Sequence, residues 1–73
     1  MLLGTILSLI KLGAEIFQDE RKDRFLKQQV RLEKEYLHEM SKPDSDRSDL
    51  TIDRLYFDAN ELAKLVIAES HSK

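Results

Sequence analysis

Residues 7 to 37, LSLIKLGAEIFQDERKDRFLKQQVRLEKEYL, decide the fold of this chain. Apolar side chains recur in this stretch at steps of three and four residues, which is the period of an α-helix. The direction of the apolar face changes at the six consecutive charged residues DERKDR, residues 19–24. At 100° per residue, the centre of the second apolar stripe is turned by roughly 150° from the centre of the first.

Two arrangements of the chain satisfy this pattern. The chain breaks or kinks near residues 19–24, or one continuous helix of about forty residues, ~60 Å long, packs against two different partners. No proline or glycine lies in the charged segment. Glu20 with Arg24 and Asp23 with Lys27 form i,i+4 pairs in the favourable order, which supports helix through this segment. We therefore expect a continuous first helix.

A turn separates this helix from a second one. Residues 41–49, SKPDSDRSD, contain the only proline and the densest group of turn-forming residues. Ser48 or Asp49 is the expected N-cap of the second helix, because its side-chain oxygen can accept from a free backbone N–H. The expected segments are an amphipathic helical segment (1–18), a charged continuation of the first helix (19–41), a turn (42–48), a second helix (49–70) and a frayed tail (71–73).

The expected fold is all-α, with a long N-terminal helix and an antiparallel second helix that form an αα-hairpin. Sustained alternation of apolar and polar residues, the signal of a strand, is missing. The side chains expected in the hairpin core share the facing sides of the two helices. They are Phe25, Leu26, Val30, Leu32, Tyr36, Leu37, Ile52, Leu55, Tyr56, Ala59, Leu62 and Val66.

Length and composition limit what can stabilise so small a fold. A chain of 73 residues rarely gains more than a few kcal/mol from one core, and it usually needs a disulfide, a metal or a partner chain. The chain has no cysteine, which excludes disulfides, and its two histidines are far apart, which argues against a structural metal site. We therefore expect a homo-oligomer that forms a helical bundle.

The apolar face of residues 2–17 is the expected contact surface of this oligomer. It consists of Leu2, Leu3, Ile6, Leu9, Ile10, Ile16 and Phe17. Burying these side chains contributes on the order of ten kcal/mol before entropy is subtracted. A soluble monomer does not leave so much apolar surface in water. Two destinations stay open: other protein chains, first of all copies of itself, or an anionic membrane surface.

A basic stripe lies on the same side as this face if the first helix is continuous. Its residues are Arg24, Lys27, Arg31 and Lys34. An apolar segment followed by cations suits a peripheral helix on an anionic membrane, whereas a spanning helix needs ~20 apolar residues. Stripes of this kind also occur as ordinary solvated faces. The net charge of −2 lacks the excess of Lys and Arg that nucleic-acid binders show, so we expect no nucleic-acid partner.

No catalytic, metal or cofactor signature stands out. Glu35 and His38 form an E-x-x-H on a helix, a pairing that di-iron bundles use, but a complete site needs a second such motif and two further carboxylates. Gly4 and Gly13 stand alone and do not form a phosphate-binding loop. We expect no enzyme, no metal and no cofactor.

The sequence therefore predicts a structural, assembly or adaptor protein that self-associates through residues 2–17 and contacts other proteins of a larger assembly. A tiny, charged helical chain of this kind would suit a viral or phage virion or accessory subunit. We expect it in the cytoplasm or within a viral particle. The alternative is a peripheral membrane protein at the inner face of a membrane, anchored by residues 2–17 with the basic stripe on anionic lipid.

Overall fold

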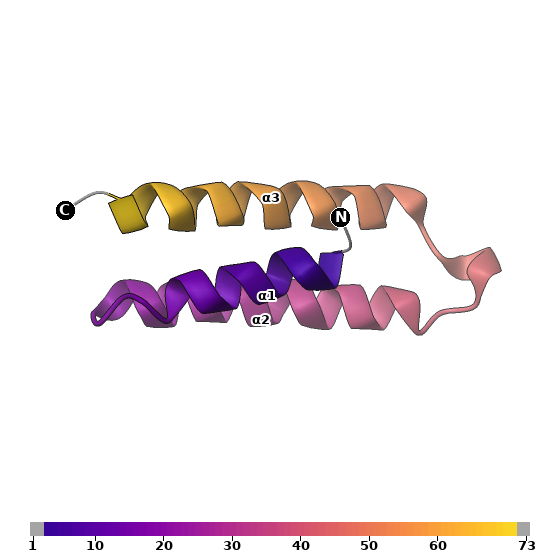
Figure 1. Ribbon diagram of the computed structural model, residues 1–73. Helices are drawn as coiled ribbons and strands as arrows, with labels where there is room; N and C mark the ends of the chain where they lie inside the picture. The colour runs from indigo at the N-terminus through magenta and orange to yellow at the C-terminus, as the bar shows by residue number, and fades with distance from the viewer. Residues whose placement is uncertain (1–2, 72–73) are drawn as a thin grey trace.

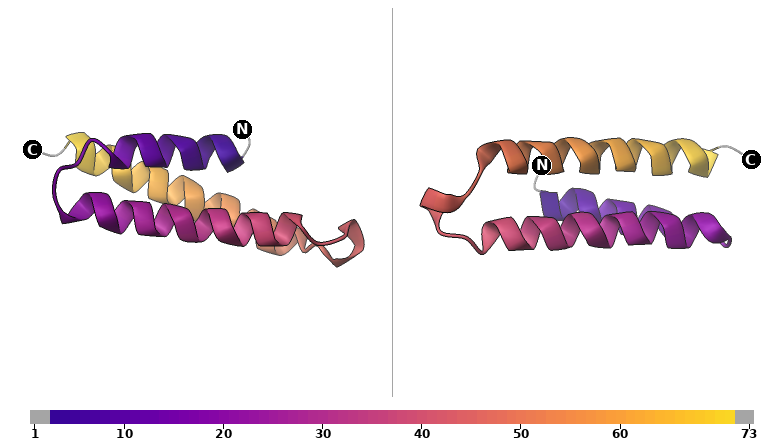
Figure 2. Two further views of the ribbon diagram at one scale, coloured as in Figure 1. Left: turned by 90° about the horizontal axis from the view of Figure 1, so that it is seen from below. Right: turned by 180° about the vertical axis from the view of Figure 1, so that it is seen from behind.

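The computed structural model describes residues 3–71, and over this range it contains helices and turns without a strand, which confirms the all-α expectation. Helix α1 spans Leu3–Ala14, α2 spans Glu20–Met40 and α3 spans Asp49–His71, with a short 3-10 turn, η1, at Asp44–Asp46. The three helices lie side by side along one long axis (Figures 1 and 2). The molecule measures 47 × 17 × 14 Å.

The continuous first helix that the sequence favoured is wrong, because the chain reverses between Ala14 and Glu20 and forms two helices. Asp19 has extended backbone angles, and its carboxylate accepts a hydrogen bond of 2.9 Å from the Arg21 amide, so it caps α2. Glu20 and Asp23 put negative charge in the first turn of α2, where the helix dipole favours it. Both expected i,i+4 pairs fall inside α2 and do not bridge α1 and α2, and neither forms a salt bridge within residues 3–71, where Arg24 pairs with Glu69 instead.

This reversal explains why the apolar face changes direction along the sequence. α1 folds back antiparallel to α2, and α3 runs parallel to α1 on the third side (Figure 2). Both apolar stripes of the first segment therefore face one shared axis. The core consists of Leu3, Ile6, Leu7, Ile10, Ala14, Phe17, Phe25, Leu32, Leu55, Ala59, Leu62 and Val66.

α1 packs closely against α3 at Gly13. A Cβ atom built on Gly13 would lie 2.8 Å from Val66 Cγ1, which is closer than two carbon atoms pack. At Gly4, by contrast, a Cβ atom would meet nothing within 4 Å. A helix of 12 residues is marginal in water by itself, so the helicity of α1 depends on this packing against α2 and α3.

An aromatic and cationic cluster holds the turn between α1 and α2 against α3. The rings of Phe17 and Phe25 are 5.5 Å apart, and the Arg21 guanidinium lies 4.5 Å from the centre of the Phe17 ring. Arg24 stacks over Phe25 at 5.0 Å and forms a 3.4 Å ion pair with Glu69 of α3. Arg21 and Arg24 thus cover the aromatic pair and connect it to the C-terminal part of α3.

Arg47 closes the turn between α2 and α3. Its Nη2 donates hydrogen bonds to the carbonyl oxygens of Met40 at 3.1 Å and of Lys42 at 3.0 Å, at the end of α2. Its Nη1 lies 2.8 Å from the Asp44 carboxylate of η1. One side chain therefore satisfies carbonyls that the helix end leaves free.

Glu39 ties the end of α2 to the start of α3. Its side chain is almost fully buried, and its carboxylate accepts hydrogen bonds from the Ser48 amide at 2.6 Å and from the Lys42 ammonium at 3.1 Å. These two donors, the Ser48 amide first, hold the pKa of Glu39 below its usual range. The Ser48 hydroxyl accepts from the Thr51 amide at 3.2 Å, which confirms Ser48 as the N-cap.

Candidate interaction surface

The outer face of α1 carries three large apolar side chains that the core does not use. Leu9, Leu12 and Ile16 are 51%, 63% and 69% exposed. Their spacing of three and four residues places them on one side of the helix, opposite its buried residues. The Ile16 amide donates to the Gly13 carbonyl at 3.3 Å, so the turn after α1 still follows the helical path. We call Leu9, Leu12 and Ile16 the α1 ridge.

The α1 ridge borders α3. Gly13, at the middle of the ridge, meets Val66, and Ile16 lines a surface hollow of about 400 Å³ together with Ser70. Ile67 follows Val66 directly, lies one turn before Ser70 and is mostly exposed. Exposed Ile67 therefore lies on α3 next in sequence to Val66, which meets Gly13 of α1.

The residues predicted as the N-terminal contact surface divide into two groups. Leu3, Ile6, Ile10 and Phe17 are buried inside the chain's own core, whereas Leu9 and Ile16 are exposed, and Leu2 lies outside the described residues. Two further leucines complete the two faces of α1. Leu7 is buried and Leu12 is exposed. Helical spacing could have assigned both leucines to these faces, because Leu7 follows Leu3 by four residues and Leu12 lies between Leu9 and Ile16 at steps of three and four.

The predicted hairpin-core residues are spread over all three classes of exposure. Phe25, Leu32, Leu55, Ala59, Leu62 and Val66 are buried, Leu26, Tyr36, Ile52 and Tyr56 are half-buried, and Val30 and Leu37 are exposed. The Leu3 amide donates to the Tyr56 hydroxyl at 3.1 Å, so the described part of α1 begins level with Tyr56. Toward η1, α2 and α3 extend beyond α1 (Figure 1), and Leu37 and Met40 in the last turn of α2 are exposed.

Two buried polar residues of α2 escaped the sequence analysis. Gln29 and Glu39 are each 4% exposed. Gln29 lies four residues after Phe25 and three before Leu32, on the core stripe, and its amide donates to Glu33 at 3.3 Å. Helical spacing alone would have placed Gln29 in the core, but its polar side chain removed it from an apolar pattern.

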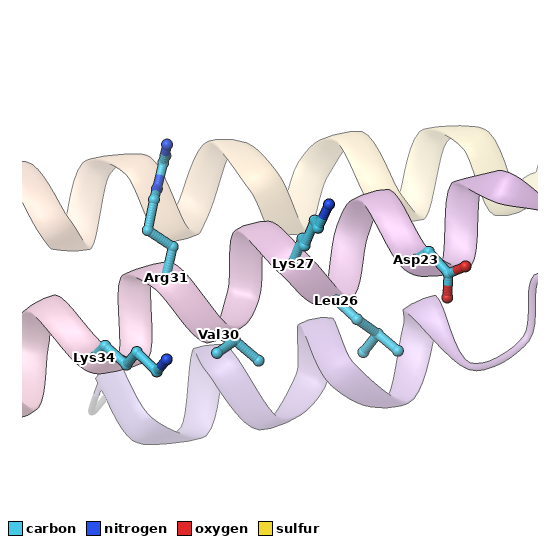
Figure 3. A pocket seen from close by; sticks show the side chains of 6 residues that line it. All are labelled: Asp23, Leu26, Lys27, Val30, Arg31 and Lys34. Carbon is cyan, nitrogen blue, oxygen red and sulfur yellow. The ribbon is translucent and has the colours of Figure 1, made fainter.

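The basic stripe lies on the side of α2 that faces away from the core. Lys27, Arg31 and Lys34 line a surface hollow of about 650 Å³, together with Asp23, Leu26 and Val30. In Figure 3, Leu26 and Val30 extend to one side of α2, toward α1, while Lys27 and Arg31 extend to the other. We call this surface the basic hollow. All the residues that line it belong to α2, so it is an open helix face and not an enclosed cavity.

The three cations of the basic hollow differ from Arg24, the fourth residue of the basic stripe, in their salt-bridge partners. Within residues 3–71, no salt bridge joins Lys27, Arg31 or Lys34 to a carboxylate. Arg24 instead pairs with Glu69 and Phe25, as described above. Because α1 and α2 are separate antiparallel helices, the basic stripe does not continue the N-terminal apolar face, as it would on one continuous helix.

Residues 3–71 were compared with two kinds of feature, a metal-binding cluster and a membrane-spanning helix. Glu35 and His38 are exposed, and residues 3–71 contain no group of three His, Cys, Asp or Glu side chains placed to hold a metal ion. Among the described helices, none combines the length and the apolar character that crossing a membrane requires. Comparison of the chain with models of protein families, with curated proteins and with solved structures gives no match.

Proposed function

We propose that this chain is a non-enzymatic assembly or adaptor protein that self-associates through the α1 ridge. The observation that supports this proposal is the pair of opposite apolar faces on α1: one is used in the core, and the other is more than half exposed. In the assembled state α2 and α3 act as the antiparallel hairpin, and the outer faces of α1 pack together into a helical bundle. A subunit of a viral or phage particle is one setting for such a protein.

A symmetric contact between two ridges is the simplest arrangement. Around a two-fold axis the same patch occurs on both sides, so the central Leu12 would pack against Leu12 of the second copy. Burying the exposed part of three aliphatic side chains contributes ~3–5 kcal/mol from each copy. The loss of free motion on association costs about 4–15 kcal/mol. The ridge alone therefore supports a weak dimer, and a stable assembly needs a further contact.

An anionic membrane is the second candidate partner of the α1 ridge. The observation that favours it is the set of cations on the neighbouring helix, Lys27 and Lys34, which have exposed Val30 beside them. Interfacial helices combine an apolar face with flanking cations in this way. Lys11 of α1, however, is balanced by Glu15 in the turn that follows, which weakens the attraction to anionic lipid.

Light scattering on the purified chain without detergent tests both candidates, with anionic liposomes added in a second series. Leu12→Glu and Ile16→Glu each place a negative charge in the ridge. Lys11→Gln is the control, since it changes the net charge by the same amount at an exposed position of α1 outside the ridge. Self-association predicts that wild type and control form the same discrete oligomer, while the ridge variants are smaller and equally helical by circular dichroism.

The liposome series separates the alternatives. A monomer that moves onto anionic liposomes, and that loses this binding in the ridge variants, assigns the ridge to a membrane. A monomer that ignores liposomes contradicts both candidates.

A further inference from the structure

Phe57 of α3 is an exposed aromatic side chain that belongs neither to the core nor to the α1 ridge. It is 63% exposed. Asp53 and Glu61 lie four residues before and four residues after it, so the three side chains follow one stripe on the outer face of α3. Leu50, one turn before Asp53, extends the stripe and is 82% exposed. We call Leu50, Asp53, Phe57 and Glu61 the acidic stripe.

The acidic stripe and the basic hollow carry mainly opposite charges at similar spacing. Each also holds one charge of the other sign: Lys64 lies 3.7 Å from Glu61, and Asp23 lines the hollow. The carboxylates of Asp53 and Glu61 start from positions eight residues apart, ~12 Å along a helix, and Phe57 is midway between them. Lys27 and Lys34 start from positions seven residues apart, ~10.5 Å along a helix, and Val30 is near the midpoint. An aromatic ring seated on Val30 would therefore place each carboxylate within reach of one ammonium group.

We propose that the basic hollow of one copy receives the acidic stripe of a second copy. The proposal rests on the proposed self-association and adds the second contact that the ridge energetics require. Both surfaces are exposed on every chain, and they are different from each other. The contact is therefore heterologous, and copies add head to tail into a ring if the rotation closes or into a filament if it does not.

Other occupants fit the basic hollow less well. A small ligand is normally enclosed over most of its surface, whereas this hollow is formed by α2 alone. A membrane surface is met by apolar side chains that protrude, but Leu26 is half-buried and extends toward α1 (Figure 3). An open helix face with cations beside exposed Val30 is instead complementary in charge to a protruding aromatic ring between two carboxylates.

Charge reversal with a mixing step tests this contact. The first variant carries Lys27→Glu and Lys34→Glu, so both of its surfaces are acidic, and the second carries Asp53→Lys and Glu61→Lys, so both are basic. Each variant alone places like charges at every contact. In an equimolar mixture, the acidic hollow of the first meets the basic stripe of the second, and the two unchanged surfaces also meet.

Sedimentation velocity at low and high salt reads out the result, with circular dichroism to show that each variant is folded. We expect association of each variant alone to weaken at least about tenfold relative to wild type, because like charges face each other. We expect the mixture to recover the wild-type mass, and salt to weaken association of the wild type and of the mixture. Phe57→Gln is expected to lower the mass with unchanged helicity.

A mixture that stays as small as its folded components overturns the head-to-tail contact. Binding of the wild type to vesicles of phosphatidylglycerol through Lys27 and Lys34, without recovery on mixing, also overturns it and assigns the basic hollow to anionic lipid. The ridge variant Leu12→Glu is run in the same experiment. If Leu12→Glu lowers the mass of the oligomer and the mixture of charge variants stays small, only the proposed head-to-tail contact is wrong. If Leu12→Glu leaves the mass unchanged and the mixture recovers the wild-type mass, only the proposed contact through the α1 ridge is wrong.

Discussion

Gly13 of α1 and Val66 of α3 meet so closely that a Cβ atom on Gly13 would lie 2.8 Å from Val66 Cγ1. The absence of a side chain at this position lets α1 lie against α3, and the core that all three helices share depends on that approach. Gly13 also lies between Leu12 and Ile16 of the α1 ridge. One glycine therefore links the packing of the core to the shape of the proposed interaction surface.

The two glycines of α1 make a matched pair for testing this relationship. Gly4→Ala replaces a flexible residue in a helix where the new methyl group meets nothing within 4 Å, so we expect it to stabilise the fold by about 0.5–1 kcal/mol. Gly13→Ala gains the same propensity but pushes a methyl group into Val66, and we expect a net loss of about 1 kcal/mol. Urea unfolding measures both. Equal stabilisation by the two substitutions would show that α1 and α3 are not this close.

The acid sensitivity of the fold follows from Asp19 and Glu39. Arg21, through its guanidinium and then its amide, lowers the pKa of Asp19, and the Ser48 amide with Lys42 lowers the pKa of Glu39. A carboxyl whose pKa is lower in the folded state stabilises the fold above its unfolded pKa of about 4 and loses this contribution as pH falls through the folded value. We expect stability to be level near neutral pH and to decrease as pH falls below about 5.

Thermal unfolding from pH 7 to pH 3 measures this dependence. Glu39→Gln removes the carboxylate from the Ser48 amide, so the variant should be less stable than wild type at pH 7 and approach it in acid. Glu35→Gln is the control on the same helix, because Glu35 is exposed. A constant difference between Glu39→Gln and wild type at every pH would contradict the role of the ionised carboxylate.

The helical period was enough to predict the fold class and the second helix, and side-chain capping chemistry limited its N-cap to Ser48 or Asp49, of which Ser48 is the cap. It was not enough to predict the break between α1 and α2. Favourable side-chain pairs in residues 19–24 are worth a few tenths of a kcal/mol each, whereas folding back buries the apolar face of α1 against two helices. The available signal was Asp19 followed by Glu20 and Asp23, an N-cap with acidic residues in the first turn.

The interaction surfaces were predictable only in part. Leu9, Ile16 and the three cations of the basic hollow were chosen from sequence, but Leu3, Ile6 and Ile10 share the same apolar pattern and are buried within the chain. Spacing identifies which residues share a face. It does not tell whether the chain itself or a partner covers that face, because this depends on where the chain turns.

Arg47 provides a test of the turn between α2 and α3. Arg47→Lys keeps the positive charge but cannot reach the carbonyls of Met40 and Lys42 at the same time, because an ammonium lacks the planar fork of a guanidinium. We expect a loss of about 1–2 kcal/mol in urea unfolding, as for hydrogen bonds to a charged group. Arg54→Lys is the control, since Arg54 is exposed on α3 and should change stability by less than about 0.5 kcal/mol. A loss of the same size in both variants would contradict the clamp.

Substitutions at Phe25 and at Phe57 distinguish the stability of the folded chain from its association with other copies. Phe25 is fully buried between Phe17 and Arg24, whereas Phe57 is 63% exposed. Phe25→Ala leaves a cavity in the core and should lower the free energy of unfolding by about 3–5 kcal/mol, which would leave so small a chain largely unfolded. Phe57→Ala should change unfolding by less than about 0.5 kcal/mol in dilute protein. At high concentration it should remove the extra stability that the wild type gains from association.

Thermal unfolding across a hundredfold range of protein concentration measures both effects. A midpoint that rises with concentration equally in wild type and in Phe57→Ala would show that Phe57 lies outside the contact between copies.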